Sequence, residues 1–160
     1  MRALRFLALF GTLAGVFSSS VVAAPKSEAT PVTLEQLASF PVEMGLGENP
    51  PPTKLEIPAE IRALDGKRIT IKGYLIPLEI EGGRVRQAVL LRDLMSCCYG
   101  TIPALNSFVL IDCSQHSLAP TIETNVPVTL VGTLKVGEIR EQDFLVGLYR
   151  LSNEPLPAAP

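Results

Sequence analysis

The feature that most limits what this chain can fold into is a short run of alternating apolar and polar residues, repeated between glycines and prolines. In residues 67–75, Ile69, Ile71 and Leu75 fall on one face and polar residues on the other. This period of two predicts a half-buried β-strand, and Gly73 within it indicates a bulge or a tight bend. Fourteen prolines and twelve glycines favour short strands and many turns over long helices.

Four further segments are predicted strands: residues 85–92, 108–113, 128–136 and 144–151. A turn at Gly82-Gly83 joins the first strand to the second. Five short strands in about 100 residues predict a mainly β domain, built as a small barrel or a sandwich. A five-stranded OB-like barrel is the first expectation, and a small β-sandwich is the alternative.

Only short helices are expected, and both precede the first long strand. Thr33 is a suitable N-cap for a helix at residues 33–37, because Gln36 follows it at the spacing of a capping box. Residues 58–64 allow a second helical segment, since proline is acceptable at a first helical position. The barrel is therefore expected to carry a short N-terminal helical segment.

Residues 1–23 have the pattern of a secretory signal peptide. Arg2 and Arg5 precede an apolar run at residues 6–17, and small residues end at Ala23. The apolar run is shorter than the about 20 residues that a spanning helix needs, so we expect cleavage near Ala23, with an uncleaved anchor as the alternative. The mature protein should then be periplasmic and meet the membrane only through its signal peptide. The remaining regions are a flexible or extended segment at 24–54, an OB-like domain at 55–153 and a tail at 154–160.

Composition argues against two classes of function. Loss of Arg2 and Arg5 with the signal peptide leaves twelve cationic residues against sixteen acidic ones, a net charge of −4. A nucleic-acid partner would require a basic face. The chain has one histidine, no G-x-S-x-G or H-E-x-x-H pattern and no glycine-rich phosphate loop, so we do not expect an enzyme.

All three cysteines and the single histidine fall in one short stretch. Cys97 and Cys98 are adjacent, and Cys113 is followed by His116 at a spacing that lets both side chains of a tight turn face one ion. Three cysteines and a histidine are a normal tetrahedral ligand set for zinc. Thiolate and imidazole ligands would equally suit copper(I). A zinc or copper site at these four residues is therefore one hypothesis, and no other cofactor is expected.

Two other interpretations of the cysteines stay open. In an oxidising compartment Cys113 could pair with Cys97 or Cys98, leaving one spare thiol and His116 as a surface residue. A redox thiol pair is the third possibility, although adjacent cysteines lack the C-x-x-C spacing and its helix N-terminus. Arg92 and Asp93, which precede the cysteines, could form an ion pair, but a solvated edge without a defined role is the first expectation.

Several short motifs carry a family resemblance over most of the mature chain. They are Ile57-Pro58, Leu64-Asp65-Gly66-Lys67, Gly73-Tyr74-Leu75-Ile76-Pro77-Leu78, Met95-Ser96-Cys97-Cys98-Tyr99-Gly100 with Pro103 and Asn106, Gly132-Thr133-Leu134 and Leu148-Tyr149-Arg150. From about residue 55 to 151 the chain resembles an exported bacterial family known as domain of unknown function 3299. The resemblance implies a periplasmic or envelope location, an OB-like fold and an association with ABC-type transport systems, some of them for metals.

Together these observations predict a non-enzymatic periplasmic binding or accessory protein. It would handle zinc or copper, or assist an envelope transport complex or another periplasmic protein. The alternative is a structural protein-interaction module closed by a disulfide, and a thiol oxidoreductase is a third class.

Overall fold

The structure is a computed structural model that describes residues 28–42, 55–95, 103–118 and 125–155. The expected signal peptide at 1–23 lies outside these residues, as do Cys97 and Cys98. No helix in the described ranges is long and apolar enough to cross a membrane.

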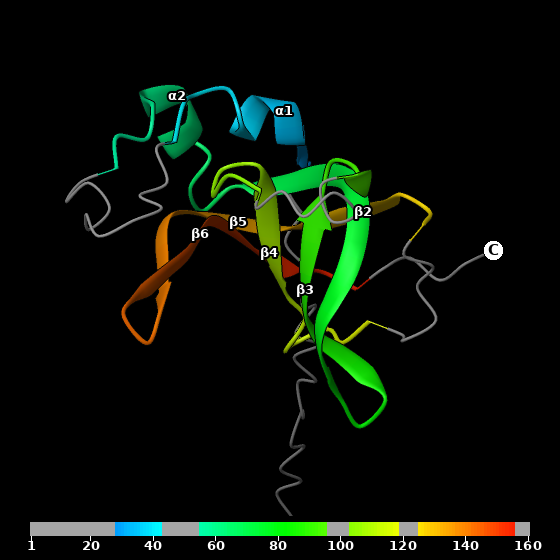
Figure 1. The fold of residues 1–160 in the computed structure, drawn as a ribbon. Helices are drawn as coiled ribbons and strands as arrows, with labels where there is room; N and C mark the ends of the chain where they lie inside the picture. The colour runs from blue at the N-terminus through cyan, green and yellow to red at the C-terminus, as the bar shows by residue number, and fades with distance from the viewer. Residues whose placement is uncertain (1–27, 43–54, 96–102, 119–124, 156–160) are drawn as a thin grey trace, which may run out of the picture.

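The described chain is mainly β, as the alternating pattern predicts (Figure 1). It contains two four-residue helices and six strands: β1 (Thr30–Pro31), α1 (Leu34–Leu37), α2 (Ala59–Arg62), β2 (Arg68–Glu81), β3 (Arg84–Leu91), β4 (Phe108–Asp112), β5 (Val128–Glu141) and β6 (Phe144–Asn153). Each of the five predicted strands is found, and β2 and β5 continue several residues beyond their predicted ends. The two-residue strand β1 was not expected.

The strands form one mixed sheet in the order β1-β2-β3-β4-β6-β5, and β2 also pairs with β5. The five strands from β2 to β6 therefore form a closed series, β2-β3-β4-β6-β5-β2, in which each is paired with two neighbours. The β1–β2 and β4–β6 pairs are parallel, and the other pairs are antiparallel. Beyond this ring, the ends of β2–β3 and of β5–β6 continue as two hairpins that project from the same side of the molecule (Figure 1).

The predicted inner face of β2 is confirmed, because Ile69, Ile71 and Leu75 are each at most 1% exposed. Gly73 lies in the same row and has a different role. A Cβ at Gly73 would stand 2.6 Å from the Leu91 carbonyl oxygen. The glycine therefore allows β3 to approach β2 closely, which is a known use of glycine inside a strand.

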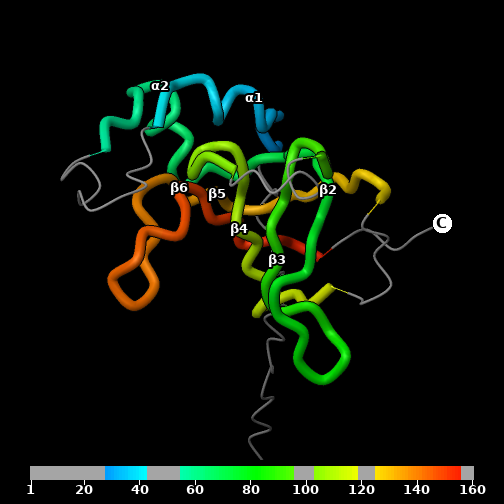
Figure 2. The backbone as a smooth tube through the Cα atoms, in the orientation of Figure 1, coloured from blue at the N-terminus to red at the C-terminus, as the bar shows by residue number. Residues whose placement is uncertain are grey.

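Residues 30–42 belong to the packed structure, although the domain was expected to begin at residue 55. Val32, Leu34, Leu37 and Phe40 are buried in the main apolar cluster. As predicted, Thr33 caps α1, since its hydroxyl oxygen accepts a hydrogen bond from the Gln36 amide. Figure 2 shows α1 and α2 together at the end of the sheet opposite the two hairpins.

Two buried hydrogen bonds attach this N-terminal segment to the sheet. The Tyr149 hydroxyl donates to the Leu37 carbonyl oxygen at 2.8 Å, and Asn106 Nδ2 donates to the Phe40 carbonyl oxygen at 2.6 Å. Both donors come from motifs that carry the family resemblance. Both acceptors are main-chain carbonyl oxygens. These bonds therefore depend on the backbone conformation of the N-terminal segment and not on its side chains.

The packed structure also extends past residue 153, where the tail was expected to start. Glu154 forms a two-pronged ion pair with Arg68, at 2.6 Å and 3.0 Å, and its amide donates to the Val131 carbonyl oxygen. Two parallel contacts between the guanidinium and the carboxylate fix the relative orientation of the two groups, which a single contact does not.

Candidate functional site

Cys113 and His116 lie close in sequence and in different surroundings. Cys113 follows β4, its amide donates to the Arg86 carbonyl oxygen at 2.9 Å, and its side chain is fully buried in the apolar cluster. His116 lies in the next loop and is exposed to solvent. The structure therefore does not bring these two side chains to a shared site.

Burial also affects the protonation of the Cys113 thiol. The loss of solvent around its thiol, with a smaller contribution from the charge of Asp112, raises the pKa of Cys113 to about 11. The thiolate is the form that binds metals and attacks disulfides. Cys113 has no disulfide partner among the described residues, and as a thiol at neutral pH it is uncharged and behaves as a small apolar side chain.

The strand register separates Cys113 from the start of the cysteine-rich loop. Leu91, at the end of β3, pairs with Phe108, whereas Asp112, next to Cys113, pairs with Gln87 near the start of β3. The five residue-to-residue steps from Phe108 to Cys113 correspond to roughly 17 Å of strand. Cys97 and Cys98 lie outside the described residues. Within the described residues, no group of three metal-binding side chains occurs. The four-residue metal site and the Cys113 disulfide both stay predictions.

The burial of Cys113 leads to a pH-dependent expectation. Folding raises the thiol pKa from 9.0 to about 11, so the buried neutral thiol contributes its full stability below pH 9. That contribution is lost as the pH rises from 9 to 11. Urea unfolding at pH 8, 9 and 10 should show a declining free energy of unfolding, and Cys113→Ala should flatten the decline.

The control for this expectation is thiol reactivity. Burial also raises the pKa of Tyr149 above its usual value near 10, so the range below pH 10 reports mainly on Cys113. In folded protein at pH 8, Cys113 should react with a thiol reagent only after denaturant is added. Fast labelling of Cys113 itself in the native state would contradict a buried, neutral thiol at this position.

An apolar groove lies between the two projecting hairpins. Its volume is about 390 Å³, and it is lined by Leu78, Gln87, Val89, Leu91, Pro103, Phe108, Leu110, Glu141 and Val146. β3 and β4 form its floor, and residues of β2, β5 and β6 form its walls. This arrangement joins five strands around one concave surface.

Irregularities in strand pairing place one apolar residue on each wall. In β2, the pairing shifts between Pro77 and Glu79, so Leu78 is an extra residue without an opposite partner. In β6, the pairing shifts between Leu145 and Gly147, so Val146 is the extra residue there. Such bulges turn a side chain away from the regular alternation. Here both extra side chains line the groove.

The floor of the groove depends on a glycine. A Cβ at Gly147 would lie 3.3 Å from the side chains of both Phe108 and Leu110. Gly147 therefore lets these two floor residues of β4 lie close against the backbone of β6. A larger residue would push them into the groove and reduce its depth.

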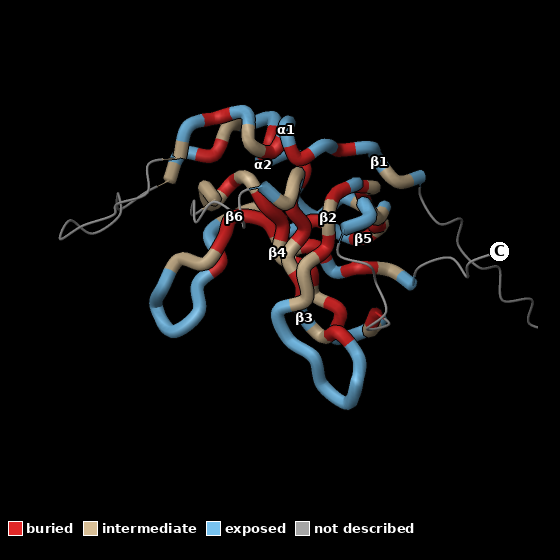
Figure 3. Tube along the Cα trace, turned by 45° about the vertical axis from the view of Figure 1, so that its right-hand side comes forward, coloured by how far each residue is buried: buried red, intermediate tan, exposed pale blue. Residues whose placement is uncertain are grey.

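The two hairpins carry large apolar side chains that are exposed to solvent. Leu78 and Ile80 are each 58% exposed, and Phe144 is 74% exposed. Figure 3 shows both hairpin ends as exposed segments on the same side of the molecule. Exposed apolar patches are typical of binding surfaces, and Leu78 is the one of these three residues that also lines the groove. Sequence reasoning missed this surface, and its only signals were the Ile76-Pro77-Leu78 run and an aromatic residue directly after a turn.

Among the described residues that line the groove, the polar side chains are Gln87 and Glu141. Glu141 lies 3.5 Å from Arg150, with its side chain 57% exposed. An ion pair of this length and exposure contributes little energy. The Glu141 carboxylate therefore stays accessible to a cationic group of a ligand.

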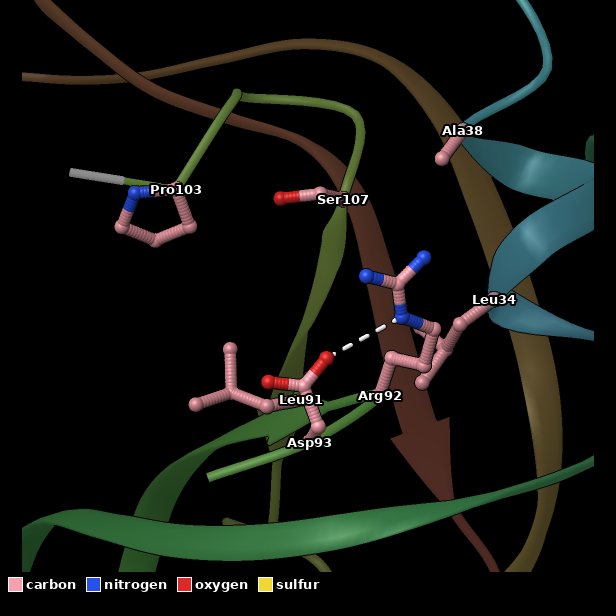
Figure 4. A pocket seen from close by; sticks show the side chains of 7 residues that line it. All are labelled: Leu34, Ala38, Leu91, Arg92, Asp93, Pro103 and Ser107. Carbon is pink, nitrogen blue, oxygen red and sulfur yellow. Dashed lines mark hydrogen bonds and ion pairs between the residues drawn. The ribbon is translucent and has the colours of Figure 1, made fainter. Parts of the chain in front are cut away.

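A second, smaller cavity of about 60 Å³ lies where β3 ends near α1 (Figure 4). Its lining includes Leu34 of α1, Arg92, Asp93 and Ser107. Arg92 and Asp93 form an ion pair, the less expected of the two alternatives, with Arg92 Nε 3.1 Å from Asp93 Oδ2, and Asp93 Oδ1 accepts a hydrogen bond from the Met95 amide. These contacts organise the turn after β3. The space suits a few water molecules and not a cofactor.

The described residues form a mainly β protein with one mixed sheet, few helices and an apolar groove. The chain belongs to the family described as a protein of unknown function, DUF3299, whose sequence model matches residues 46–156. Its fold is similar to the crystal structure of a DUF3299 family protein from Pseudomonas aeruginosa PAO1, with 23% sequence identity and a TM-score of 0.55. The match covers 79% of this chain and 93% of that one. No curated protein matches the chain.

Proposed function

We propose that this protein is an exported, non-enzymatic accessory protein that binds another envelope protein through the groove between its two hairpins. The observation that carries the proposal is the convergence of Leu78 and Val146, two bulge residues on opposite walls, over an apolar floor. An apolar concavity with few polar groups is typical of a binding site. An envelope location is supported by the signal-peptide pattern at residues 1–23.

The strand pairings support an OB-like barrel as the framework of this binding site. The ring β2-β3-β4-β6-β5 returns to β2 and contains one parallel pair, β4–β6. In OB-folds the ligand lies on the second and third strands, between the first-to-second and fourth-to-fifth loops. In the proposed framework β3 and β4, the floor of the groove, correspond to these second and third strands, and the two hairpins correspond to these loops.

Binding of a partner protein is favoured over metal handling by what the described residues offer. Cys113 is buried and neutral, and His116 is exposed away from it. The metal hypothesis therefore depends on Cys97 and Cys98. Assistance to an ABC-type transport complex is the form of partner binding that the family resemblance implies.

Site-specific photocrosslinking in the native cell tests the proposal. A photoreactive residue at Val89, on the groove floor, should form one discrete adduct with an envelope protein. The matched control is the same residue at Thr133, an exposed position on β5 that does not line the groove. We expect no such adduct at Thr133.

A second substitution makes the test specific. Leu78→Lys places a charge on the exposed wall of the groove and should reduce the Val89 adduct by about tenfold, because a buried cation is costly at an apolar interface. The thermal unfolding temperature should stay within a few degrees, since Leu78 is 58% exposed. Equal adducts at both positions, or none at Val89, would overturn the proposal.

A further inference from the structure

Within the groove, the first half of β6 has one edge without a strand partner. β4 and β6 pair only from Leu110 opposite Arg150 to Asp112 opposite Ser152. Toward the hairpin, residues 144–147 pair with β5 alone. In the described chain, no backbone hydrogen bond outside the sheet ladders involves residues 144–147.

An unpaired strand edge presents a row of backbone N–H and C=O groups, at every second residue. These groups can bind another extended chain, which is the strand-addition mode of peptide recognition. β1 already shows that this sheet accepts a short added strand, since Thr30–Pro31 pairs in parallel with β2.

The free edge and the apolar groove are one continuous surface. Val146 belongs to the edge segment and also lines the groove, and Phe108 and Leu110 pack beside Gly147 on the floor. A strand added along β6 would direct every second side chain onto this floor. The backbone edge would supply hydrogen bonds, and the floor would select apolar residues at alternate positions.

The charge of the groove lining adds a second requirement. Glu141 is the one charged residue among the described residues that line the groove, and its contact with Arg150 is long and exposed. A cationic side chain on the added strand would complement this carboxylate.

We propose that the partner binds as an extended peptide strand along residues 144–147 of β6, with apolar side chains at alternate positions and a lysine or arginine beside Glu141. This inference rests on the proposed function and specifies its partner. It excludes a helical segment lying in the groove, which would leave the β6 edge unpaired.

A selection from random peptides of about ten residues, the upper length of a typical strand, tests this mode. The selected peptides should alternate apolar and polar residues and contain a basic residue. Methylation of their backbone nitrogens, one at a time, should weaken binding by about fivefold or more at every second position, because each methyl group removes one interchain hydrogen bond. Amide hydrogen exchange within residues 144–147 should slow at the same time.

Glu141→Gln should weaken the binding of the peptides that contain a basic residue. It should not change the binding of control peptides in which glutamine replaces that basic residue. The matched control is Glu138→Gln on the same hairpin, outside the groove lining. Peptides that show no alternating methylation pattern, or binding of an oligosaccharide in place of any peptide, would overturn strand addition. If Val89 still forms its adduct in cells, the failure is confined to the binding mode and the proposed function stands.

Discussion

Leu37→Ala is expected to lower the free energy of unfolding by about 3 kcal/mol. Leu37 is fully buried at the end of α1, in the cluster that also contains residues of β2, β5 and β6. Removing a buried leucine side chain costs the transfer of its methyl groups and leaves a cavity. The effect should be large although residue 37 precedes the part of the chain that resembles the family. Urea unfolding followed by circular dichroism measures it.

Gln36→Ala is the matched control, because Gln36 is the neighbouring residue of α1 and its side chain is exposed. Only its backbone amide takes part in the Thr33 cap, so the substitution should change stability by less than about 0.5 kcal/mol. Similar small effects of both substitutions would mean that residues 30–42 contribute no packing energy in solution.

The helix itself could be predicted from sequence, and its packing could not. A capping box is a local signal, which is why the Thr33 cap was found. A four-residue helix is unstable alone, so α1 depends on contacts with the sheet. Those contacts come from residues far along the chain, such as Tyr149, whose hydroxyl holds the Leu37 carbonyl. No local pattern around residue 37 indicates that partner.

The strands show the same division between local and long-range information. Ile69 and Ile71 alternate with polar residues, and their burial follows from that alternation. The bulges at Leu78 and Val146 depend on how each strand pairs with its neighbour. The alternating pattern of one strand does not contain that register, so the groove was not predicted.

The burial of Cys113 shows the same limit of local patterns. The types of residue at Cys113 and His116 indicate metal chemistry, and their spacing is compatible with a shared ion. Spacing does not show which side chain faces the core. Cys113 continues the inward row of β4 with Val109 and Ile111, and all three are at most 1% exposed. Its burial follows from period-two alternation, which competes with the metal interpretation at this position.

Gly132→Ala is the second substitution for which we expect a large effect, a loss of about 3 kcal/mol or a failure to fold. Gly132 lies where β5 passes between β2 and β6, opposite Ile69 on one side and Asn153 on the other. A Cβ there would collide with the Ser152 carbonyl oxygen and lie 3.0 Å from the Asn153 Cα. These are backbone atoms in paired strands, so they cannot move without breaking the ladder. Overpacking at a rigid position is destabilising.

Thr133→Ala provides the control for Gly132→Ala, because Thr133 is the next residue of β5 and its side chain is exposed. It should shift the thermal unfolding temperature by only a few degrees, against roughly 10 °C or more for Gly132→Ala. A Gly132→Ala protein as stable as the Thr133→Ala protein would show that β5 and β6 are further apart than the register requires. The ring of strand pairings, and with it the OB-like framework proposed for the groove, would then fail. A large and selective loss would instead mean that the close approach of these strands holds the two hairpins in place on either side of the groove.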